Sequence, residues 1–436
     1  MTANEDKKHI SIVVAGHVDA GKSSLTGRLL YDMGGIDERM MEKLKKKAEE
    51  MGKPSFAFAY YMDNQKAEQE RGITIACNTK EFHTSRYHYT IIDAPGHRDF
   101  IKNMITGSSQ ADVALLLCPA DGSSFVASIA KGDHKTGEVP GQTRNHARLL
   151  NLLGIKQLIV GINKMDTEVE GETYSEKRFI EVSTEVKRIL VQEGWTKGQV
   201  ESEIPIIPMA GFHGQNILTK SELMPWWKGV TVKIATNGDT CKVECLLDGL
   251  DKMVNLPPRN ETAAFRAPVG KVITSIKGIE CVVTSRLEQG VLNKGEEVVF
   301  LPTHTASNPC AGKVFTIEMH HKEHPQAGPG DNVGMSLKGL PKANMPRAGD
   351  LMIKKADTSV KSCGTFTCQA MVLDHPNQIK CGYSPNCYVR TSHAACRLVG
   401  INFKMGKKST GGVKVEEPEF IEKGDMCELV FKPCSP

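Results

Sequence analysis

The stretch Gly16-His17-Val18-Asp19-Ala20-Gly21-Lys22-Ser23 decides the fold that we expect of this chain. It follows an apolar run at residues 10–15, typical of a strand buried on both faces, and precedes a helical pattern at residues 24–31. Its glycines allow a tight turn in which consecutive backbone N–H groups face a polyphosphate, beside a helix N-terminus that favours anions. The spacing predicts a P-loop, in which Lys22 reaches the phosphates and Ser23 ligates Mg²⁺.

A second motif, Asn163-Lys164-Met165-Asp166, follows the apolar run at residues 157–162. It therefore lies at the carboxyl end of a predicted strand, where α/β sheets bind ligands. An ionised Asp166 accepts hydrogen bonds only, and guanine offers it N1–H and N2–H₂ as donors, whereas adenine offers no such pair. Buried hydrogen bonds of this kind reject the wrong partner by roughly 10⁴–10⁵. Together the two motifs predict GTP and GDP as ligands, with Asn163 bridging the base and the phosphate loop.

Two further segments have the pattern of nucleotide switches. Asp93-Ala94-Pro95-Gly96-His97 follows another predicted strand, which places Asp93 to reach Mg²⁺ through water and the Gly96 N–H to meet the γ-phosphate. In Arg71-Gly72-Ile73-Thr74, the hydroxyl of Thr74 can bind Mg²⁺ and its N–H the γ-phosphate. Both contacts are lost on hydrolysis, so we expect both segments to order and disorder with the nucleotide. The alternative for Thr74 is an ordinary threonine at a strand edge.

Length and composition limit the class of protein. A chain of 436 residues predicts two to three domains, and 40% apolar with 24% charged residues is typical of a soluble globular protein. No apolar run reaches the ~20 residues of a membrane span, and the polar N-terminus gives no sign of a signal peptide, which favours a cytoplasmic location away from membranes. The thirteen cysteines include no Cys-x-x-Cys pair, so reduced core thiols are favoured over a zinc or disulfide framework. A net charge of +4 neither requires nor excludes nucleic acid.

The chain changes its organisation after about residue 230. Before that point, predicted strands alternate with helical stretches, which predicts a mostly parallel sheet with helices on both faces, an α/β P-loop GTP-binding domain at residues 1–255. Later in this domain, strands are predicted at residues 113–118 and 157–162, and helices at residues 143–153 and 176–192. An amphipathic helix is predicted by the apolar stripe Ile36, Met40, Leu44, Ala48 and Met51, with a solvated lysine face favoured over an RNA contact.

After a proline-containing linker near residues 256–260, short strands alternate with turns. This pattern predicts a β-barrel at residues 256–357, and a second all-β barrel domain at residues 358–436. The predicted strands lie at residues 269–274, 281–287, 297–301, 313–320, 332–337, 365–373, 387–391, 396–403 and 427–431.

With these motifs and domains, the chain resembles the translation elongation GTPases of the elongation factor 1-alpha and elongation factor Tu family. The resemblance is carried by the P-loop, the Arg71–Thr74 motif, residues 93–104 and the Asn163–Asp166 motif, and by residues 318–321, 330–334, 374–376 and 382–385 of the later domains. Divergence between the motifs, and a loop at residues 123–141 that looks longer than in elongation factor 1-alpha, suit the elongation-factor-like branch. The family's third domain continues through further strands, so the resemblance implies that the second barrel, domain 3, is truncated at its C-terminal end.

The resemblance also assigns nucleotide contacts. The family's Ser-Gly-Trp loop at the guanine ring corresponds here to Ala210-Gly211-Phe212, where a hydroxyl is lost but backbone contacts can remain. The predicted nucleotide-binding residues are Gly16, His17, Val18, Asp19, Ala20, Gly21, Lys22, Ser23, Ser24, Asp93, Gly96, Asn163, Lys164, Asp166, Ala210, Gly211 and Phe212, and the predicted Mg²⁺ ligands are Ser23, Thr74 and, through water, Asp93.

The function implied by the resemblance is GTP-dependent delivery of aminoacyl-tRNA to the ribosomal A site, with hydrolysis to GDP and phosphate on codon recognition. His97 is expected to position the attacking water, with Val18 and Ile73 as a hydrophobic gate that holds it back. The tRNA 3′ end is expected at Glu318 and His321, with help from Arg286 and Glu288. A guanine nucleotide exchange factor is a possible partner, and a monomer is expected.

Three other interpretations of the function remain open. A release or rescue GTPase of the same superfamily usually carries a long N-terminal extension, for which residues 1–8 leave no room. A GTPase subunit of sulfate activation shares the P-loop and the Asp-x-Pro-Gly motif, and would be recognised by an ATP-sulfurylase partner. A nucleotide-binding scaffold without hydrolysis is disfavoured by the intact Thr74, Asp93 and His97.

Overall fold

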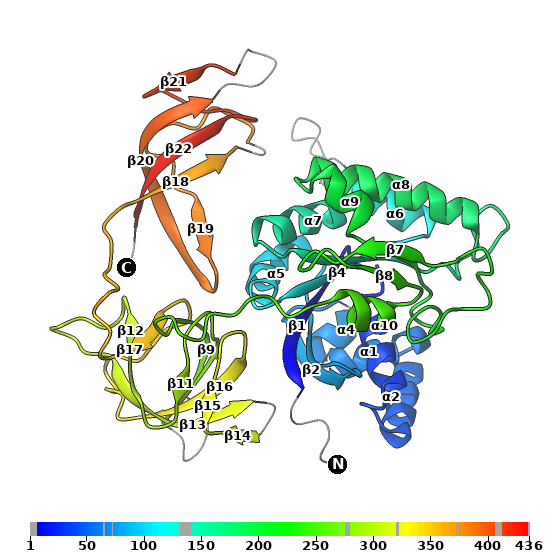
Figure 1. Cartoon of the computed structure of the whole chain (residues 1–436), viewed down its shortest axis with the longest axis horizontal. Coiled ribbons are helices and arrows are strands. Elements are labelled where there is room, and N and C mark those ends of the chain that lie inside the picture. Colours follow the sequence, from blue (N-terminus) through cyan, green and yellow to red (C-terminus); the bar gives the residue numbers. More distant parts are fainter. Residues whose placement is uncertain are drawn as a thin grey trace. The chain divides into compact units, whose positions relative to one another are not determined.

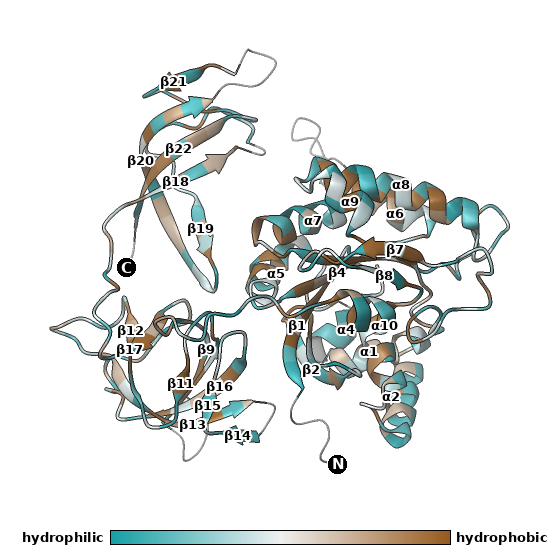
Figure 2. Ribbon diagram, viewed as in Figure 1, coloured by the Kyte–Doolittle hydropathy of each residue, from teal (hydrophilic) through white to brown (hydrophobic). Residues whose placement is uncertain are grey.

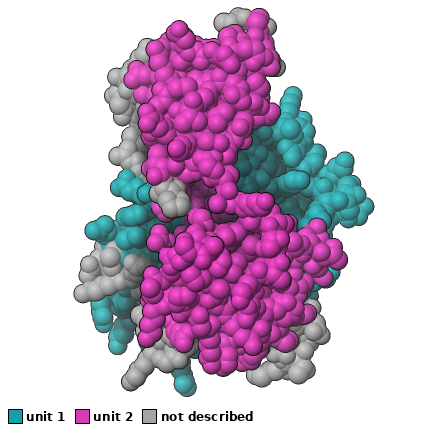
Figure 3. Space-filling view, turned by 90° about the vertical axis from the view of Figure 1, so that its left-hand side faces the viewer, with its two compact units in different colours: residues 1–258 teal, residues 259–436 magenta. Residues whose placement is uncertain are grey.

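The chain forms two compact units, residues 1–258 and 259–436 (Figure 3). The computed structural model describes residues 7–63, 66–71, 73–130, 141–274, 280–319, 322–372, 375–405 and 412–434. Within the first unit helices and strands alternate, whereas the elements described in the second unit are strands.

A six-stranded sheet forms the centre of the first unit, in the order β2-β3-β1-β4-β5-β6. Its strands are β1 (Lys8–Gly16), β2 (Asn78–His83), β3 (Tyr87–Asp93), β4 (Val113–Pro119), β5 (Gln157–Asn163) and β6 (Ile206–Pro208). All neighbours are parallel except β2, which runs antiparallel to β3 at one edge. Every residue of β4 and β5 is buried, as expected for unbroken apolar runs covered on both faces.

Helices cover both faces of this sheet, with α1 and α2 on one side and α7, α8 and α9 on the other (Figure 1). The helices are α1 (Lys22–Asp32), α2 (Glu38–Glu50), α3 (Ala59–Met62), α4 (Lys66–Arg71), α5 (Ile101–Ser108), α6 (Gly122–Ile129), α7 (Gln142–Leu152), α8 (Glu176–Gln192), α9 (Lys197–Ser202) and α10 (Leu246–Asp248), with single turns η1 (Pro54–Phe56), η2 (Arg98–Phe100) and η3 (Gly249–Met253). Along α8 the ribbon changes between hydrophilic and hydrophobic residues, as in a helix with one face on a core (Figure 2). The predicted α/β fold is confirmed.

The amphipathic helix predicted around residue 44 is present as α2, but two local predictions were wrong in part. In the helix predicted around residue 44, Met40 is 44% exposed and its neighbour Met41 is 2% exposed. The Asp37 carboxylate accepts a hydrogen bond from the Met40 N–H and caps α2, which begins at Glu38, and this start sets which side chains face the core. The predicted loop at residues 123–141 is instead helical at its start, where the Asp121 carboxylate caps α6. Residues 131–140 lie outside the described part of the chain.

In the described part of the second unit, two larger antiparallel sheets each have their own hydrophobic core, and β11 and β15 form a separate short pair. The first sheet closes into a barrel, because β12 pairs with both β17 and β13. Its strands, with a short side pair formed by β11 and β15, are β9 (Ala267–Ile273), β10 (Cys281–Arg286), β11 (Leu292–Asn293), β12 (Glu297–Leu301), β13 (Ala311–Met319), β14 (Lys322–His324), β15 (Gln326–Ala327), β16 (Asn332–Lys338) and β17 (Leu351–Lys354).

The second sheet has the order β18-β22-β20-β19, with β21 paired to β20. Its strands are β18 (Phe366–Met371), β19 (Asn386–Val389), β20 (Ser392–Met405), β21 (Lys414–Glu416) and β22 (Met426–Pro433). The prediction that all-β domains follow the α/β domain is therefore confirmed. No helix among the described residues is long and apolar enough to cross a membrane.

Candidate functional site

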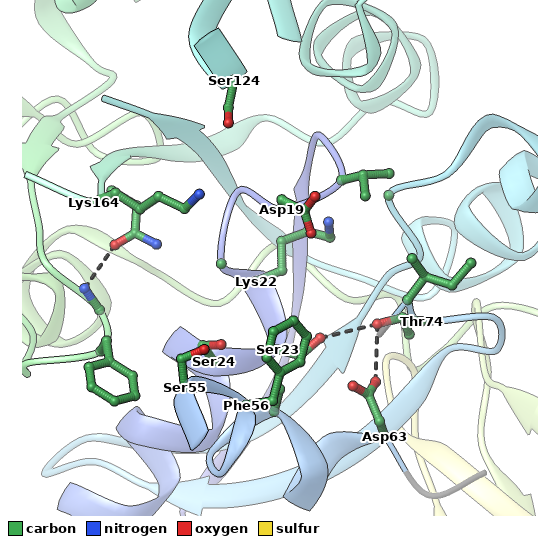
Figure 4. Close-up of a pocket in the computed structure, with 18 of the residues that line it drawn as sticks. Asp19, Lys22, Ser23, Ser24, Ser55, Phe56, Asp63, Thr74, Ser124 and Lys164 are labelled. Atoms are coloured by element: carbon green, nitrogen blue, oxygen red, sulfur yellow. Dashed lines mark hydrogen bonds between the residues drawn. The ribbon is translucent and has the colours of Figure 1, made fainter. Parts of the chain in front are cut away.

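A cavity of about 690 Å³ opens in the first unit, at the carboxyl end of the central sheet (Figure 4). The segments that follow β1, β3, β5 and β6 all contribute to it. Its wall contains these predicted residues: Val18, Asp19, Gly21, Lys22, Ser23, Ser24, Ile73, Thr74, Gly96, His97, Asn163, Lys164, Asp166, Gly211 and Phe212. Gly16, His17, Ala20, Asp93 and Ala210 do not line the cavity but belong to the same segments.

The phosphate end of the cavity is built around a buried lysine. Lys22 is 7% exposed, and its ammonium donates a hydrogen bond of 2.8 Å to the backbone carbonyl of His17. Burial lowers the pKa of Lys22, and the charges of Asp93, Asp19 and Asp63 oppose that shift. A buried cation beside an open cavity is placed to bind an anion such as a polyphosphate.

The loop that carries this lysine needs unusual backbone conformations. Asp19 has φ +60° and Gly21 has φ +83°, both in the left-handed region. Aspartate is among the few residues with a side chain that adopt this region readily. A Cβ atom on Gly21 would also lie 2.5 Å from Nδ2 of Asn163, so glycine is required there. Asp19, whose residue type the motif left unexplained, is therefore accounted for by its backbone.

Next to the lysine lies a group of oxygen ligands suited to a divalent cation. The Ser23 and Thr74 hydroxyls are 3.1 Å apart, and the Thr74 hydroxyl donates to the Asp63 carboxylate at 3.2 Å (Figure 4). Asp93 is fully buried, and neither of its carboxylate oxygens has a hydrogen-bond partner of ordinary geometry among the described residues. Two hydroxyls, one orphaned carboxylate and room for phosphate oxygens match what Mg²⁺ binds in nucleotide sites.

Burial disfavours the charged form of the two carboxylates in this group, Asp63 and Asp93. It raises the pKa of Asp93 to about 6, although the Ser23 hydroxyl and the Lys22 ammonium lower it. It raises the pKa of Asp63 to about 7, with the negative charges of Asp93 and Glu68 adding to the effect. A divalent cation would offset this repulsion, since it favours the charged form of both groups.

Gly96 and His97 also line the cavity, and Gly96 lies against the P-loop. A Cβ atom on Gly96 would lie 2.4 Å from Nζ of Lys22 and 3.0 Å from the backbone nitrogen of Val18, so a larger residue would displace the lysine. The His97 side chain is 38% exposed at the cavity wall. Its Nδ1 accepts a hydrogen bond of 3.2 Å from the backbone N–H of Asp99. Val18, Ile73 and His97 all line this cavity, and their role as a gate stays a prediction.

The base end is organised by Asn163. Its amide nitrogen donates to the carbonyl of Ala20 in the P-loop at 2.9 Å, and its amide oxygen accepts from the N–H of Gly211 at 2.8 Å. The side chain thus bridges the phosphate loop and the loop of residues 210–212. Nearby, the Lys164 ammonium is paired with Asp121 at 2.9 Å, and Asp166 lies at the cavity wall, 3.5 Å from Nε2 of His213.

Several contributors were missed at the sequence level. Ser55, Phe56, Ala59, Asp63, Ser124 and Thr167 also line the cavity. Below the P-loop, Nδ1 of the buried His146 accepts a hydrogen bond of 3.0 Å from the N–H of Gly16. Burial, with the charges of Lys22 and His17, lowers the pKa of His146 to about 3, which keeps the ring neutral and able to accept. Of this group, Ser124 had a usable signal, because it follows a predicted strand at its carboxyl end.

The residues predicted for the tRNA 3′ end lie in the barrel of the second unit. Arg286 is opposite Asn332 and Glu318 is opposite Gly334, so the two side chains share one face across β16. Glu288 lies 3.4 Å from Arg390, which offsets its charge. The prediction for His321 falls outside the described residues.

Known protein families match this chain domain by domain. Models of three families match in order: "Elongation factor Tu GTP binding domain" at residues 7–256, "Elongation factor Tu domain 2" at residues 281–352 and "Elongation factor Tu C-terminal domain" at residues 359–436. Elongation factor 1-alpha of Methanosarcina barkeri is 43% identical over 432 residues, covering 99% of this chain and 91% of that protein. The Entamoeba histolytica protein of the same name is 41% identical over 99% of this chain and 89% of its own length, and the oocyte form from Xenopus laevis 42% over 99% and 88%.

Solved structures show the same fold. The Ski7 GTPase-like domain of S. cerevisiae, bound to GTP, has a TM-score of 0.75 at 18% identity and covers 99% of this chain and 90% of that one. A bacterial selenocysteine-specific elongation factor has a TM-score of 0.61 at 20% identity, covering 98% of this chain and 54% of that one. Because the sequence relatives span nearly the whole chain at well above 30% identity, this chain belongs to the elongation factor 1-alpha and elongation factor Tu family, GTP-dependent translation elongation factors that bind guanine nucleotides and hydrolyse GTP.

Proposed function

We propose that this protein delivers aminoacyl-tRNA to the ribosomal A site in complex with GTP and hydrolyses the GTP on codon recognition. The observation that carries the proposal is the identity of 41–43% to proteins named elongation factor 1-alpha over 99% of this chain, with all three family domains in order. The structural likeness to Ski7 concerns the fold alone, because only 18% of residues are identical. A ribosome and a guanine nucleotide exchange factor are the further partners proposed, and the acting form is a monomer.

In this account the cavity of the first unit holds GTP and Mg²⁺. Lys22 would contact the β- and γ-phosphates, Ser23 and Thr74 would ligate the cation, and Asp93 would hold one of its water ligands. A bound cation would supply positive charge against the phosphates. Thr74 and Gly96 contact the γ-phosphate, so its loss on hydrolysis releases both segments and lowers the affinity for tRNA.

The tRNA 3′ end binds on the face of the barrel that carries Arg286 and Glu318. An aminoacylated 3′ end presents hydroxyl and ammonium donors, which a carboxylate accepts, and phosphates, which a guanidinium binds. Gly334 lies opposite Glu318 and contributes no side chain, which leaves room between the two charged groups.

We expect Glu318→Ala to weaken the binding of aminoacyl-tRNA to the GTP-analogue form by 10- to 100-fold, because a hydrogen bond to a charged group is worth about 1.5–3 kcal/mol. The measurement is a fluorescence titration with labelled aminoacyl-tRNA. Glu297→Ala is the matched control, because Glu297 lies on β12 and pairs with Lys355 at 2.7 Å. Unchanged affinity in Glu318→Ala, or an equal loss in the control, would show that this face does not bind the 3′ end.

The identity to archaeal, amoebal and vertebrate relatives is nearly the same, at 43%, 41% and 42%. This sequence is about equally different from the proteins of three very different organisms. That observation supports its proposed place in a divergent, elongation-factor-like branch of the family.

A further inference from the structure

We infer that Arg28 is a positioning residue that holds the base loop, defined here as residues 210–212, and thereby sets the residence time of the guanine nucleotide. Arg28 lies on α1 and does not line the cavity. Its Nη1 nevertheless donates a hydrogen bond of 2.9 Å to the backbone carbonyl of Phe212, 184 residues later in the chain. The inference rests on the proposed binding of guanine against this loop.

The guanidinium is itself held from two sides. Its Nε donates to both carboxylate oxygens of Asp32, at 2.8 and 2.9 Å, one helical turn further along α1. Its Cζ atom lies 5.4 Å from the centroid of the Phe58 ring, within the range of a cation–π interaction. Phe58 in turn packs edge-on against Phe212, with ring centroids 5.9 Å apart. Arg28 therefore presents a fixed donor to the loop.

The backbone around Arg28 leaves space for its guanidinium. Gly214 has φ +78°, and a Cβ atom there would lie 2.6 Å from Nη2 of Arg28. One residue before Arg28, a Cβ atom on Gly27 would lie 2.1 Å from the carbonyl oxygen of Phe58. Gly27 and Gly214 therefore lie where the Phe58 segment and the chain after the base loop approach α1. Because glycine has no side chain, both segments can come close to Arg28.

The base loop is consequently fixed at two points. Asn163 accepts from the N–H of Gly211 on the inner side, and Arg28 donates to the carbonyl of Phe212 on the outer side. The Phe212 side chain is 39% exposed, so burial alone does not immobilise it. Without the outer contact the loop would occupy other conformations, and apparent affinity falls in proportion to the fraction of protein that is competent to bind.

The test is the dissociation rate of fluorescent GDP and of a fluorescent GTP analogue from the full chain. We expect Arg28→Met to raise both rates about tenfold and by the same factor, since the base loop contacts neither phosphate. Steady-state hydrolysis should show a higher KM for GTP at unchanged kcat. Arg28→Lys keeps the charge but cannot serve Asp32 and Phe212 together, so its rates should be intermediate, and Asp32→Asn should give a smaller increase.

Arg188→Met is the matched control, because Arg188 also pairs with a carboxylate on its own helix, Glu185, and lies outside the cavity wall. Dissociation rates of Arg28→Met within twofold of the original would overturn the inference, as would an increase for the GTP analogue alone. If Asp166→Asn fails to change base preference, the proposed placement of guanine is wrong. If it succeeds while Arg28→Met has no effect, only the inference about Arg28 fails.

Discussion

His97→Ala should lower ribosome-stimulated GTP hydrolysis by about 10³-fold while leaving the affinity for GTP and GDP within a few-fold of the original. Hydrolysis of GTP depends on positioning and charge more than on covalent chemistry, so loss of a water-orienting group reduces kcat and not nucleotide binding. His97 lies at the cavity wall beside Gly96, whose N–H is proposed to contact the γ-phosphate. The intrinsic rate without ribosomes should be slow, on the order of 10⁻⁴–10⁻² s⁻¹, as in unassisted GTPases.

His97→Gln distinguishes positioning from base catalysis. A glutamine side chain can orient a water molecule through its amide but does not accept a proton, so we expect it to retain more activity than alanine. The measurement is single-turnover hydrolysis with programmed ribosomes at saturating enzyme. Full stimulated turnover in His97→Ala would remove His97 from the reaction, and equal losses in both variants would favour a proton-accepting role.

Asp166→Asn should convert the preference for guanine into one for xanthine. Affinity for GTP should fall by roughly 10³–10⁴, because the carboxylate that accepts from N1–H and N2–H₂ is replaced by an amide. Xanthine carries a carbonyl in place of the 2-amino group, and the new amide N–H₂ can donate to it. Asn163, Lys164 and the P-loop are unchanged in this variant, so the phosphate contacts should remain.

The measurement for Asp166→Asn is competition of GTP and XTP against a fluorescent nucleotide, followed by hydrolysis of each. His213→Ala is the control, since His213 approaches the same carboxylate at 3.5 Å without being expected to bind the base. Retained preference for GTP in Asp166→Asn would place the guanine ring elsewhere in the cavity.

The sequence predicted best those parts of the fold that local chemistry encodes. The P-loop glycines, the buried runs that became β4 and β5, and the motif at residues 163–166 are each defined by a few neighbouring residues. Strand β2, which pairs antiparallel at the sheet edge, and the hairpin of β7 (Val230–Lys233) and β8 (Thr240–Val243) were missed. The β2 segment has no regular apolar alternation, and β7 and β8 are only four residues long each, so their pairing partners decide them.

The site shows the same division between local and tertiary information. Asp63 has no motif, yet folding brings its carboxylate to the hydroxyl of Thr74, 11 residues later. His146 contacts the P-loop and Arg28 contacts the base loop. Both residues lie on helices whose sequence pattern indicates only that one face is apolar. Such residues become recognisable only when contacts between distant segments are known, because their types are common on any helix.

The measurement that tests the central proposal most directly is the protection of aminoacyl-tRNA from spontaneous deacylation, with a GTP analogue and with GDP, at two salt concentrations. We predict protection in the GTP-analogue form alone, weakening as salt screens contacts with phosphates. Absence of protection in both nucleotide states, in a protein shown to bind GTP, would contradict delivery of aminoacyl-tRNA by this chain.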